Sequence, residues 1–242
     1  MSLCRFQGGS GGLNETDFEA GAIIPIDKPP GMTSFDVVRR IRRWTGCRKV
    51  GHGGTLDPGA TGLLLICTGK ATRRFGELMA YDKVYEGVVE LGRQTRTDDS
   101  EGEIIAVRPV PEFTPEVIRE TLHAFEGEID QVPPIFSALK KKGKPLYRYA
   151  RKGIPVTPEP RKIRIDEITL LGWRRPDISI RIRCGKGTYI RALARDLGER
   201  LGTGGFLKAL RRTQIGPYRV DTAPTLEAFG RQLGFHEDFQ NG

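Results

Sequence analysis

The segment Gly-His-Gly-Gly-Thr-Leu-Asp-Pro-Gly-Ala-Thr-Gly occupies residues 51–62 of the 242-residue chain. Its five glycines and one proline predict a tightly folded loop, because these residues favour turns and interrupt regular elements. The apolar run Leu63–Cys67 follows directly and predicts a buried element that anchors the loop. Such a loop can hold the Asp57 carboxylate in a fixed pose near a ligand. Spacing alone leaves a second interpretation open, and favours it: an Asx-type turn in which Asp57 merely caps the chain.

Sequence patterns for nucleotide and metal chemistry fail in this chain. A phosphate loop would need Ser or Thr after Gly69-Lys70, where Ala71 stands, and a dinucleotide fingerprint would need glycine at Leu56. The three histidines and four cysteines are scattered without metal-ligand spacing. We therefore expect no metal, no nucleotide cofactor and no disulfide framework, and we expect a reducing cytoplasm.

The charge of the chain favours a polyanionic partner. Thirty-nine lysines and arginines against thirty acidic residues give a formal net charge of +9. No apolar run approaches the ~18 residues that a membrane span requires, so no membrane association is expected. The basic residues form two clusters, for each of which a merely solvated face is the alternative. The clusters are Arg39, Arg40, Arg42, Arg43, Arg48 and Lys49, and Lys140, Lys141, Lys142, Lys144, Arg148, Arg151 and Lys152.

Hydrophobic periodicity predicts strands with a few interspersed helices. Ser34 is the expected N-cap of the first helix, and the strand at 104–107 is expected to pair with the strand at 83–91. This order favours an α+β fold with a mixed, mostly antiparallel central sheet flanked by helices. The expected strands are 23–26, 83–91, 104–107, 163–173 and 178–184, and the expected helices begin near residues 34, 115, 146 and 188.

Composition divides the chain into three parts. Residues 1–21 predict a disordered tail, residues 22–220 the folded domain, and residues 221–242 a short C-terminal tail that could hold one short helix. Within the domain, about 127–160 is rich in proline, lysine and arginine and predicts a basic, irregular insertion.

Motifs in collinear order over roughly residues 23–220 resemble the TruB family of tRNA pseudouridine synthases. The loop at 51–62 resembles the catalytic motif of that family, and the insertion resembles its RNA-binding thumb. The further matching motifs are Ile26-Asp27-Lys28-Pro29, Lys83-Val84-Tyr85, Gln131-Val132-Pro133-Pro134, Cys184-Gly185-Lys186-Gly187-Thr188-Tyr189-Ile190-Arg191 and Leu210-Arg211-Arg212-Thr213.

The resemblance implies the pseudouridine synthase fold and a reaction at one uridine of the tRNA T-loop, labelled 55. It assigns Asp57 as the catalytic carboxylate, which acts as nucleophile or proton relay. Arg191 would pair with Asp57 and keep the pKa of its carboxyl low. Tyr85 would stack under the flipped uracil, with a half-buried strand tyrosine as the alternative.

The same resemblance supplies substrate-binding candidates. His52 would contact or replace the displaced base, and Leu210 would line the base pocket. Lys28 and Pro29 would support the loop or touch RNA directly, and the sequence leaves both roles open. The remaining candidates, which would hold RNA phosphates, are Lys140, Lys141 and Lys186.

The chain departs from the family pattern at its C-terminal end. Many TruB relatives carry a further RNA-binding domain, for which the roughly thirty residues after the Leu210–Thr213 block are too few. We expect a monomer with no obligatory protein partner, acting on the tRNA T stem-loop. Two alternatives stay open: an RNA-binding protein without catalysis, and an enzyme that modifies another RNA.

Overall fold

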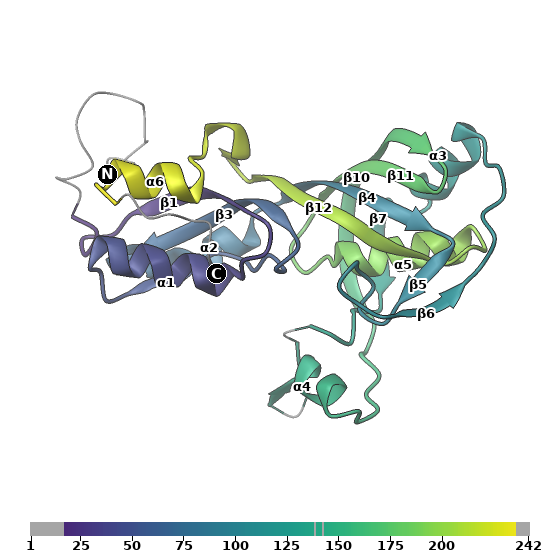
Figure 1. Cartoon of the computed structure of the whole chain (residues 1–242), viewed down its shortest axis with the longest axis horizontal. Coiled ribbons are helices and arrows are strands. Elements are labelled where there is room, and N and C mark those ends of the chain that lie inside the picture. The colour runs from purple at the N-terminus through teal and green to yellow at the C-terminus, as the bar shows by residue number, and fades with distance from the viewer. Residues whose placement is uncertain (1–16, 138, 142, 236–242) are drawn as a thin grey trace. The chain divides into compact units, whose positions relative to one another are not determined.

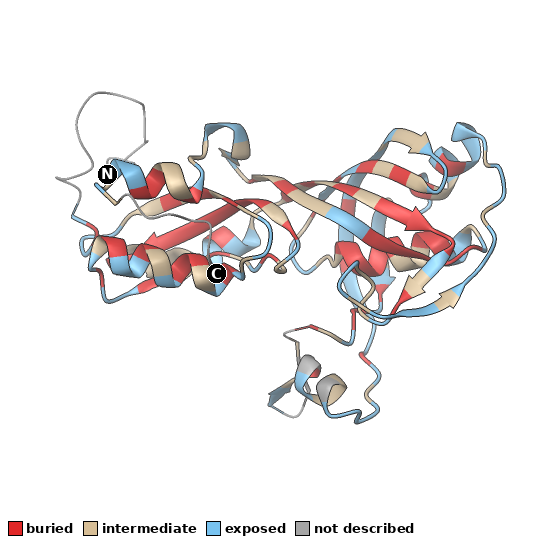
Figure 2. Ribbon diagram, in the orientation of Figure 1, coloured by how far each residue is buried: buried red, intermediate tan, exposed pale blue. Residues whose placement is uncertain are grey.

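The computed structural model describes residues 17–137, 139–141 and 143–235, and its chain divides into two compact units (Figure 1). The first unit comprises Met1–Tyr81 and Arg212–Gly242, and the second comprises Asp82–Arg211. Strand β12 (Gly205–Ile215) crosses the boundary, because its last four residues belong to the first unit. Figure 2 shows buried residues concentrated along the strands of each unit. The expected α+β class with predominantly antiparallel pairing is confirmed.

The first unit is built around β3 (Thr61–Thr68). Strand β3 pairs antiparallel with β1 (Ile23–Lys28) and with β2 (Val50–His52), and it also neighbours β12. Residues 62–68 of β3 are all buried, as expected for a strand covered on both faces. The loop at 51–62 therefore connects two strands of one sheet, which fixes both of its ends. The shorter elements here are η2 (Gly69–Arg74), α2 (Phe75–Ala80), β13 (Tyr218–Arg219) and η3 (Val220–Thr222).

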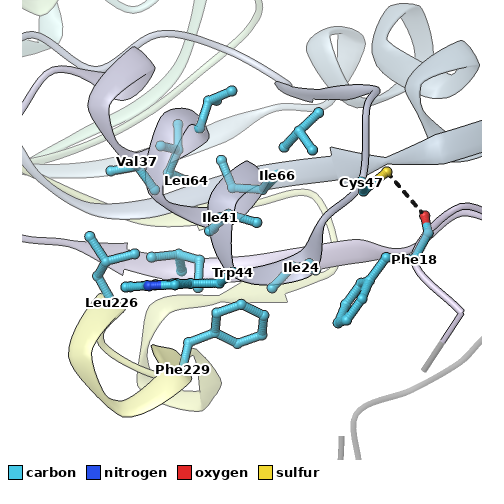
Figure 3. Packing of buried hydrophobic residues seen from close by; sticks show 13 residues of the cluster. Phe18, Ile24, Val37, Ile41, Trp44, Cys47, Leu64, Ile66, Leu226 and Phe229 are labelled. Carbon is cyan, nitrogen blue, oxygen red and sulfur yellow. Dashed lines mark hydrogen bonds between the residues drawn. The ribbon is translucent and has the colours of Figure 1, made fainter. Parts of the chain in front are cut away.

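Helices α1 (Ser34–Thr45) and α6 (Leu226–Gln232) share one hydrophobic core with β1 and β3. Trp44 packs against Phe229 with ring centroids 6.5 Å apart, and Leu64 and Ile66 of β3 belong to the same cluster (Figure 3). Phe18 belongs to the same cluster. The predicted disorder is therefore wrong at residue 18, which this core buries, whereas the short helix that the C-terminal tail could hold is confirmed as α6. Residues 1–16 and 236–242 of the predicted tails lie outside the described residues.

The start of α1 differs from the prediction by one residue. Thr33, not Ser34, is the N-cap: its hydroxyl accepts from Asp36 N, and the Asp36 carboxylate accepts from Thr33 N in a capping box. Ser34 is the first helical residue and is buried. Its hydroxyl is thus available for another contact, described below.

In the second unit β11 (Asp177–Cys184) pairs with β4 (Lys83–Leu91) on one side and β10 (Arg161–Arg174) on the other. Burial alternates along β11, with Ile178, Ile180 and Ile182 buried and Arg181 and Arg183 exposed. Helix α3 (Pro115–His123) contacts β10, α5 (Ile190–Arg200) contacts β4, and the two helices contact each other.

Two predicted boundaries in this unit are corrected. Strand β6 (Ile104–Val107) pairs with β5 (Arg93–Thr95) and not with β4, which lies between β12 and β11. Strand β7 (Gly127–Gln131), assigned to the insertion by composition, pairs with β10 in the sheet. The excursion from the sheet therefore begins after Gln131. It contains β8 (Lys140–Lys141), β9 (Lys144–Pro145) and α4 (Leu146–Arg151), whereas Lys142 lies outside the described residues.

Candidate active site

The residue before Asp57 is fixed by the first helix. The Ser34 hydroxyl accepts from Leu56 N at 2.8 Å and donates to Leu56 O at 3.0 Å. Both Ser34 and the Leu56 side chain are buried. One hydroxyl thus satisfies both peptide groups of Leu56 away from water, where unpaired groups are costly.

The residue after Asp57 is fixed by the segment that follows β1. Pro58 O accepts from Gly31 N at 3.0 Å and from the Lys28 ammonium at 3.1 Å. Lys28 has no exposed surface, and its ammonium also donates to Pro29 O at 2.8 Å and Met32 O at 2.7 Å. A side chain with no exposed surface does not reach an RNA ligand in this conformation. Of the two roles left open for Lys28, support of the loop is the one that fits, and Pro29 contributes a carbonyl to it.

The start of the loop is held by Arg212 from β12. Arg212 is 2% exposed, and its guanidinium donates to Leu63 O at 2.8 Å, Gly54 O at 3.1 Å and Thr55 O at 3.4 Å. The contact spans about 150 residues of sequence, so no local pattern could predict it. In the sequence, Arg212 is recognisable only as part of the Arg-Arg pair after Leu210, which does not indicate what it binds.

Asp57 lies between these fixed neighbours and is partly exposed. The turn closes through its main chain, because Asp57 O accepts from Ala60 N at 3.1 Å. Three clamps therefore act on the peptide groups around Asp57: Ser34 on Leu56, Lys28 on Pro58, and Arg212 on Gly54 and Thr55. Such an arrangement fixes the main chain on both sides of Asp57, which a single oriented catalytic group would need.

His52 ends β2 at the entry of the loop. Its burial, and then the Arg212 guanidinium, lower the pKa of this imidazole below its ordinary value of 6.5. Its Nδ1 atom is buried and, within the described part of the chain, has no hydrogen-bond partner. The neutral ring is therefore the form that the fold favours.

Tyr85 and Leu210 lie on neighbouring strands of the second unit. Tyr85 is 9% exposed on β4, opposite Ile182 of β11. Leu210 lies on β12 beside β4, where its Cδ1 atom would lie 3.6 Å from a Cβ placed on Gly87. Leu210 therefore packs against the β4 main chain at Gly87.

Arg191 is the second residue of α5 and is 7% exposed. Its guanidinium donates to Thr97 O and Phe136 O, each at 3.0 Å, and lies 3.5 Å from the Asp99 carboxylate. No local pattern in the sequence predicts that Asp98 and Asp99 face α5. The expected pairing of Arg191 with Asp57 joins residues of different units and stays a prediction.

One helical turn further along α5, Arg195 repeats this arrangement. It donates to the Asp98 carboxylate at 3.0 Å and to Val132 O at 2.8 Å. Gln131 exchanges two hydrogen bonds with the main chain of Tyr189, at 3.1 and 2.9 Å. The start of the excursion is therefore tied to the N-terminal half of α5.

The three lysines expected to hold RNA phosphates lie in the second unit. Lys186 is exposed in the loop between β11 and α5, and Lys140 and Lys141 form β8. Arg181, exposed on β11, is paired with Glu86 at 2.7 Å. Among the described residues no cluster of His, Cys, Asp and Glu could hold a metal ion. In the same part of the chain, no helix is long and apolar enough to cross a membrane.

Two models of protein families match the chain. Residues 42–190 match the TruB family pseudouridylate synthase N-terminal domain. The chain belongs to the TruB family. Residues 191–240 match the tRNA pseudouridylate synthase B C-terminal domain. This second match includes α5, β12 and α6, so part of what the family describes as C-terminal completes the first unit here.

Curated TruB relatives resemble the chain over most of its length. A protein of Thermobifida fusca is 48% identical over 222 residues, covering 88% of this chain and 76% of that protein. Relatives from Ralstonia nicotianae and Opitutus terrae are 50% and 46% identical, covering 85% and 87% of this chain and 67% and 87% of those proteins. All three are named tRNA pseudouridine synthase B.

Solved structures confirm the expected pseudouridine synthase fold. A chain in a Cbf5–Nop10–Gar1 complex is 30% identical with a TM-score of 0.69, covering 90% of this chain and 58% of that one. A chain in an H/ACA RNP bound to a substrate RNA containing 2′-deoxyuridine is 29% identical with a TM-score of 0.66, covering 91% and 57%. This TruB chain thus spans somewhat over half the length of these two structures.

Proposed function

We propose that this protein isomerises uridine 55 in the T-loop of tRNA to pseudouridine, with Asp57 as the catalytic carboxylate. Its membership of the TruB family and the names of its curated relatives support the reaction and the substrate class. The observation that carries the role of Asp57 is its setting. The peptide groups on both sides are bound by buried side chains, while Asp57 itself stays partly exposed. A merely structural turn would not need clamps from three distant elements.

The reaction breaks the bond between uracil N1 and ribose C1′ and forms a bond from C5 to the same carbon. The proton on C5 is released, and N1 takes up a proton. No electron is transferred, so an oriented carboxylate suffices as nucleophile or proton relay. The uridine has to leave the base stack before Asp57 can reach it.

The other candidates take complementary roles in this proposal. Tyr85 provides a ring on which the flipped uracil stacks, and Leu210 lines the base pocket beside it. Arg191 orients the Asp57 carboxylate and favours its ionised form. His52 occupies the space from which the base is withdrawn, and its neutral ring suits a site that must accept an uncharged base.

The lysines of the second unit hold the RNA backbone. Lys140 and Lys141 on the excursion and Lys186 beside α5 contact phosphates of the T stem-loop, which makes binding dependent on salt. The expected monomer would act in the cytoplasm without a protein partner.

The test uses tRNA tritiated at C5 of its uridines and the purified full chain. Isomerisation releases the C5 tritium into water, so wild-type protein should release one equivalent per tRNA. Asp57→Asn should abolish release while tRNA binding, measured by filter retention, persists. Release by Asp57→Asn at the wild-type rate would refute the catalytic assignment.

A second candidate substrate is a different RNA, as in the complex of the neighbour that carries a substrate RNA. The higher identity to proteins named for tRNA, 46–50% against 29–30%, favours tRNA. Transcripts of tRNA with uridine 55 replaced by cytidine should release no tritium. Release from such transcripts would favour the alternative, and tRNA binding without any release would favour an RNA-binding protein without catalysis.

A further inference from the structure

Arg212 is an arginine buried without an acid. Its three hydrogen bonds all go to main-chain carbonyls, and no carboxylate within the described ranges forms an ion pair with it. Burying an arginine is costly unless its donors are satisfied, and a stabilising counter-charge is missing here. A fold that only needed to fill this space could use an apolar side chain. The charge and the fork of donors therefore point to a function.

The carbonyls that Arg212 binds belong to the loop that carries Asp57. Gly54 has a φ of +122°, a region that residues with a side chain rarely adopt. Thr55 is exposed and lies two residues before Asp57. The side chains of this stretch cannot hold the loop from within, because one residue has none and the other points to solvent. The guanidinium of Arg212 binds the carbonyls of both Gly54 and Thr55.

The end of the loop meets the same residue. Gly62 has a φ of +99°, and a Cβ placed on it would lie 2.3 Å from Arg212 O and 2.8 Å from Arg212 N. The backbone of β12 at Arg212 therefore lies directly against Gly62. Arg212 therefore contacts both ends of the 51–62 loop. Its side chain binds Gly54, and its main chain lies against Gly62.

We propose that Arg212 is a positioning residue of the pseudouridine synthase reaction, which sets the pose of Asp57 through the main chain of Gly54 and Thr55. The inference rests on the proposed function of Asp57. Arg212 is buried and acts on the peptide groups of the loop. Its loss should therefore lower the rate of the chemical step more than the affinity for RNA.

The charge of Arg212 has a second, separable effect. It contributes to the low pKa of His52, after the larger contribution of burial. Arg212→Lys keeps the charge but cannot reproduce a planar fork that reaches three carbonyls. Arg212→Met removes both. The two variants therefore separate geometry from electrostatics.

The test measures kcat and KM for tritium release, with Arg219→Met as the matched control. Arg219 is an exposed arginine of the same unit that pairs with Asp221, so its loss should leave both constants unchanged. We expect Arg212→Lys to lower kcat about a hundredfold, the scale of a small misplacement of a reacting group, with KM within threefold. A raised KM with normal kcat would overturn the proposal, since it would make Arg212 an RNA-binding residue.

Gly54→Ala changes the loop residue whose carbonyl Arg212 binds. A Cβ there would lie 3.8 Å from Arg212 Nη1 and clash with nothing, but the positive φ disfavours alanine and turns the Gly54 carbonyl away. This variant should lose kcat without unfolding. Arg212→Lys and Gly54→Ala combined should be no worse than the more severe single change, and independent, multiplying losses would overturn the proposal.

Two readouts do not depend on activity. Amide hydrogen exchange at Gly53–Leu56 should accelerate in Arg212→Lys and not in Arg219→Met. The His52 ring, followed by NMR, should keep its low pKa in Arg212→Lys and titrate closer to 6.5 in Arg212→Met. Unchanged exchange in a variant that has lost kcat would refute the positioning role. Activity in Asp57→Asn with accelerated exchange in Arg212→Lys would instead refute the proposed function and leave the loop contact intact.

Discussion

Around the 51–62 loop, the buried cations Lys28 and Arg212 donate to main-chain carbonyls, whereas on α5 the cations Arg191 and Arg195 also face carboxylates. The difference follows from what each partner segment offers. A loop with five glycines presents mostly peptide groups, so a donor-rich side chain must bind its carbonyls. The turn opposite α5 carries Asp98 and Asp99, so the arginines there bind side chains as well.

The two arrangements should respond differently to their surroundings. The carbonyls that Lys28 and Arg212 bind do not titrate, so these hydrogen bonds should not change with pH as the acids protonate. A pair with a carboxylate does titrate. Burial raises the pKa of Asp98 in spite of the neighbouring Arg195 and Arg191, so desolvation offsets part of the attraction in that pair.

Lys28→Met should have the largest effect on stability. It leaves Pro29 O and Met32 O without this donor, and Pro58 O with Gly31 N alone, in a site that has no exposed surface. We expect a loss of roughly 4 kcal/mol in the free energy of unfolding, measured by urea denaturation. Lys70→Met, which removes an exposed lysine of the same unit, is the control. A loss as small as that of the control would show that carbonyl binding by Lys28 is not what holds the loop.

Ser34→Ala should come second. It removes the one hydroxyl that satisfies both peptide groups of buried Leu56, and we expect a loss of about 2 kcal/mol together with a lower kcat. Thr33→Ala removes the helix cap next to it, at a cost of about 1 kcal/mol. Because the cap does not touch the loop, that variant should keep its kcat. An equal loss of kcat in both variants would mean that α1, and not the Ser34 contact, controls Asp57.

Arg195 and Asp98 should show a smaller, coupled effect. A double-mutant cycle of Arg195→Met and Asp98→Asn, measured by thermal unfolding, should give a coupling of about 1 kcal/mol at neutral pH. The exposed pair of Arg175 and Glu112, 3.2 Å apart in the same unit, should give no measurable coupling. Equal couplings for the two pairs would mean that the partly buried arginine on α5 gains no more from its carboxylate than an exposed arginine does.

His52 should contribute the smallest effect, visible only in acid. Since its pKa is lowered in the folded protein, the unfolded chain binds the proton more readily, and stability falls as the pH drops below about 6.5. Above that pH the contribution is fully present. His52→Gln should therefore lose less stability between pH 7 and pH 5 than the wild type does. Identical pH profiles would mean that the ring is not held neutral by the fold.

Much of the fold was predictable because its signals are local. The strands at 83–91 and 178–184 are confirmed, as are the helices that begin near residues 115 and 146. Partners of strands were less predictable: β6 was assigned to β4 by proximity in sequence, and β7 to the insertion by composition. Strand pairing depends on which edges remain open after the whole sheet has formed, and no local pattern contains that information.

The sequence by itself determined the chemistry-bearing segment and the family, because a run of glycines around one aspartate and several collinear motifs are written in adjacent residues. The tertiary structure decided how Asp57 is held. Ser34 was predicted as a helix cap and Lys28 had an open role, and each became a clamp only when its strand or helix packed against the loop. Arg212 lies about 150 residues from the carbonyls that it binds. A contact over that distance exists only once β12 has been placed beside β3, because hydrogen bonds depend on spatial and not on sequence separation.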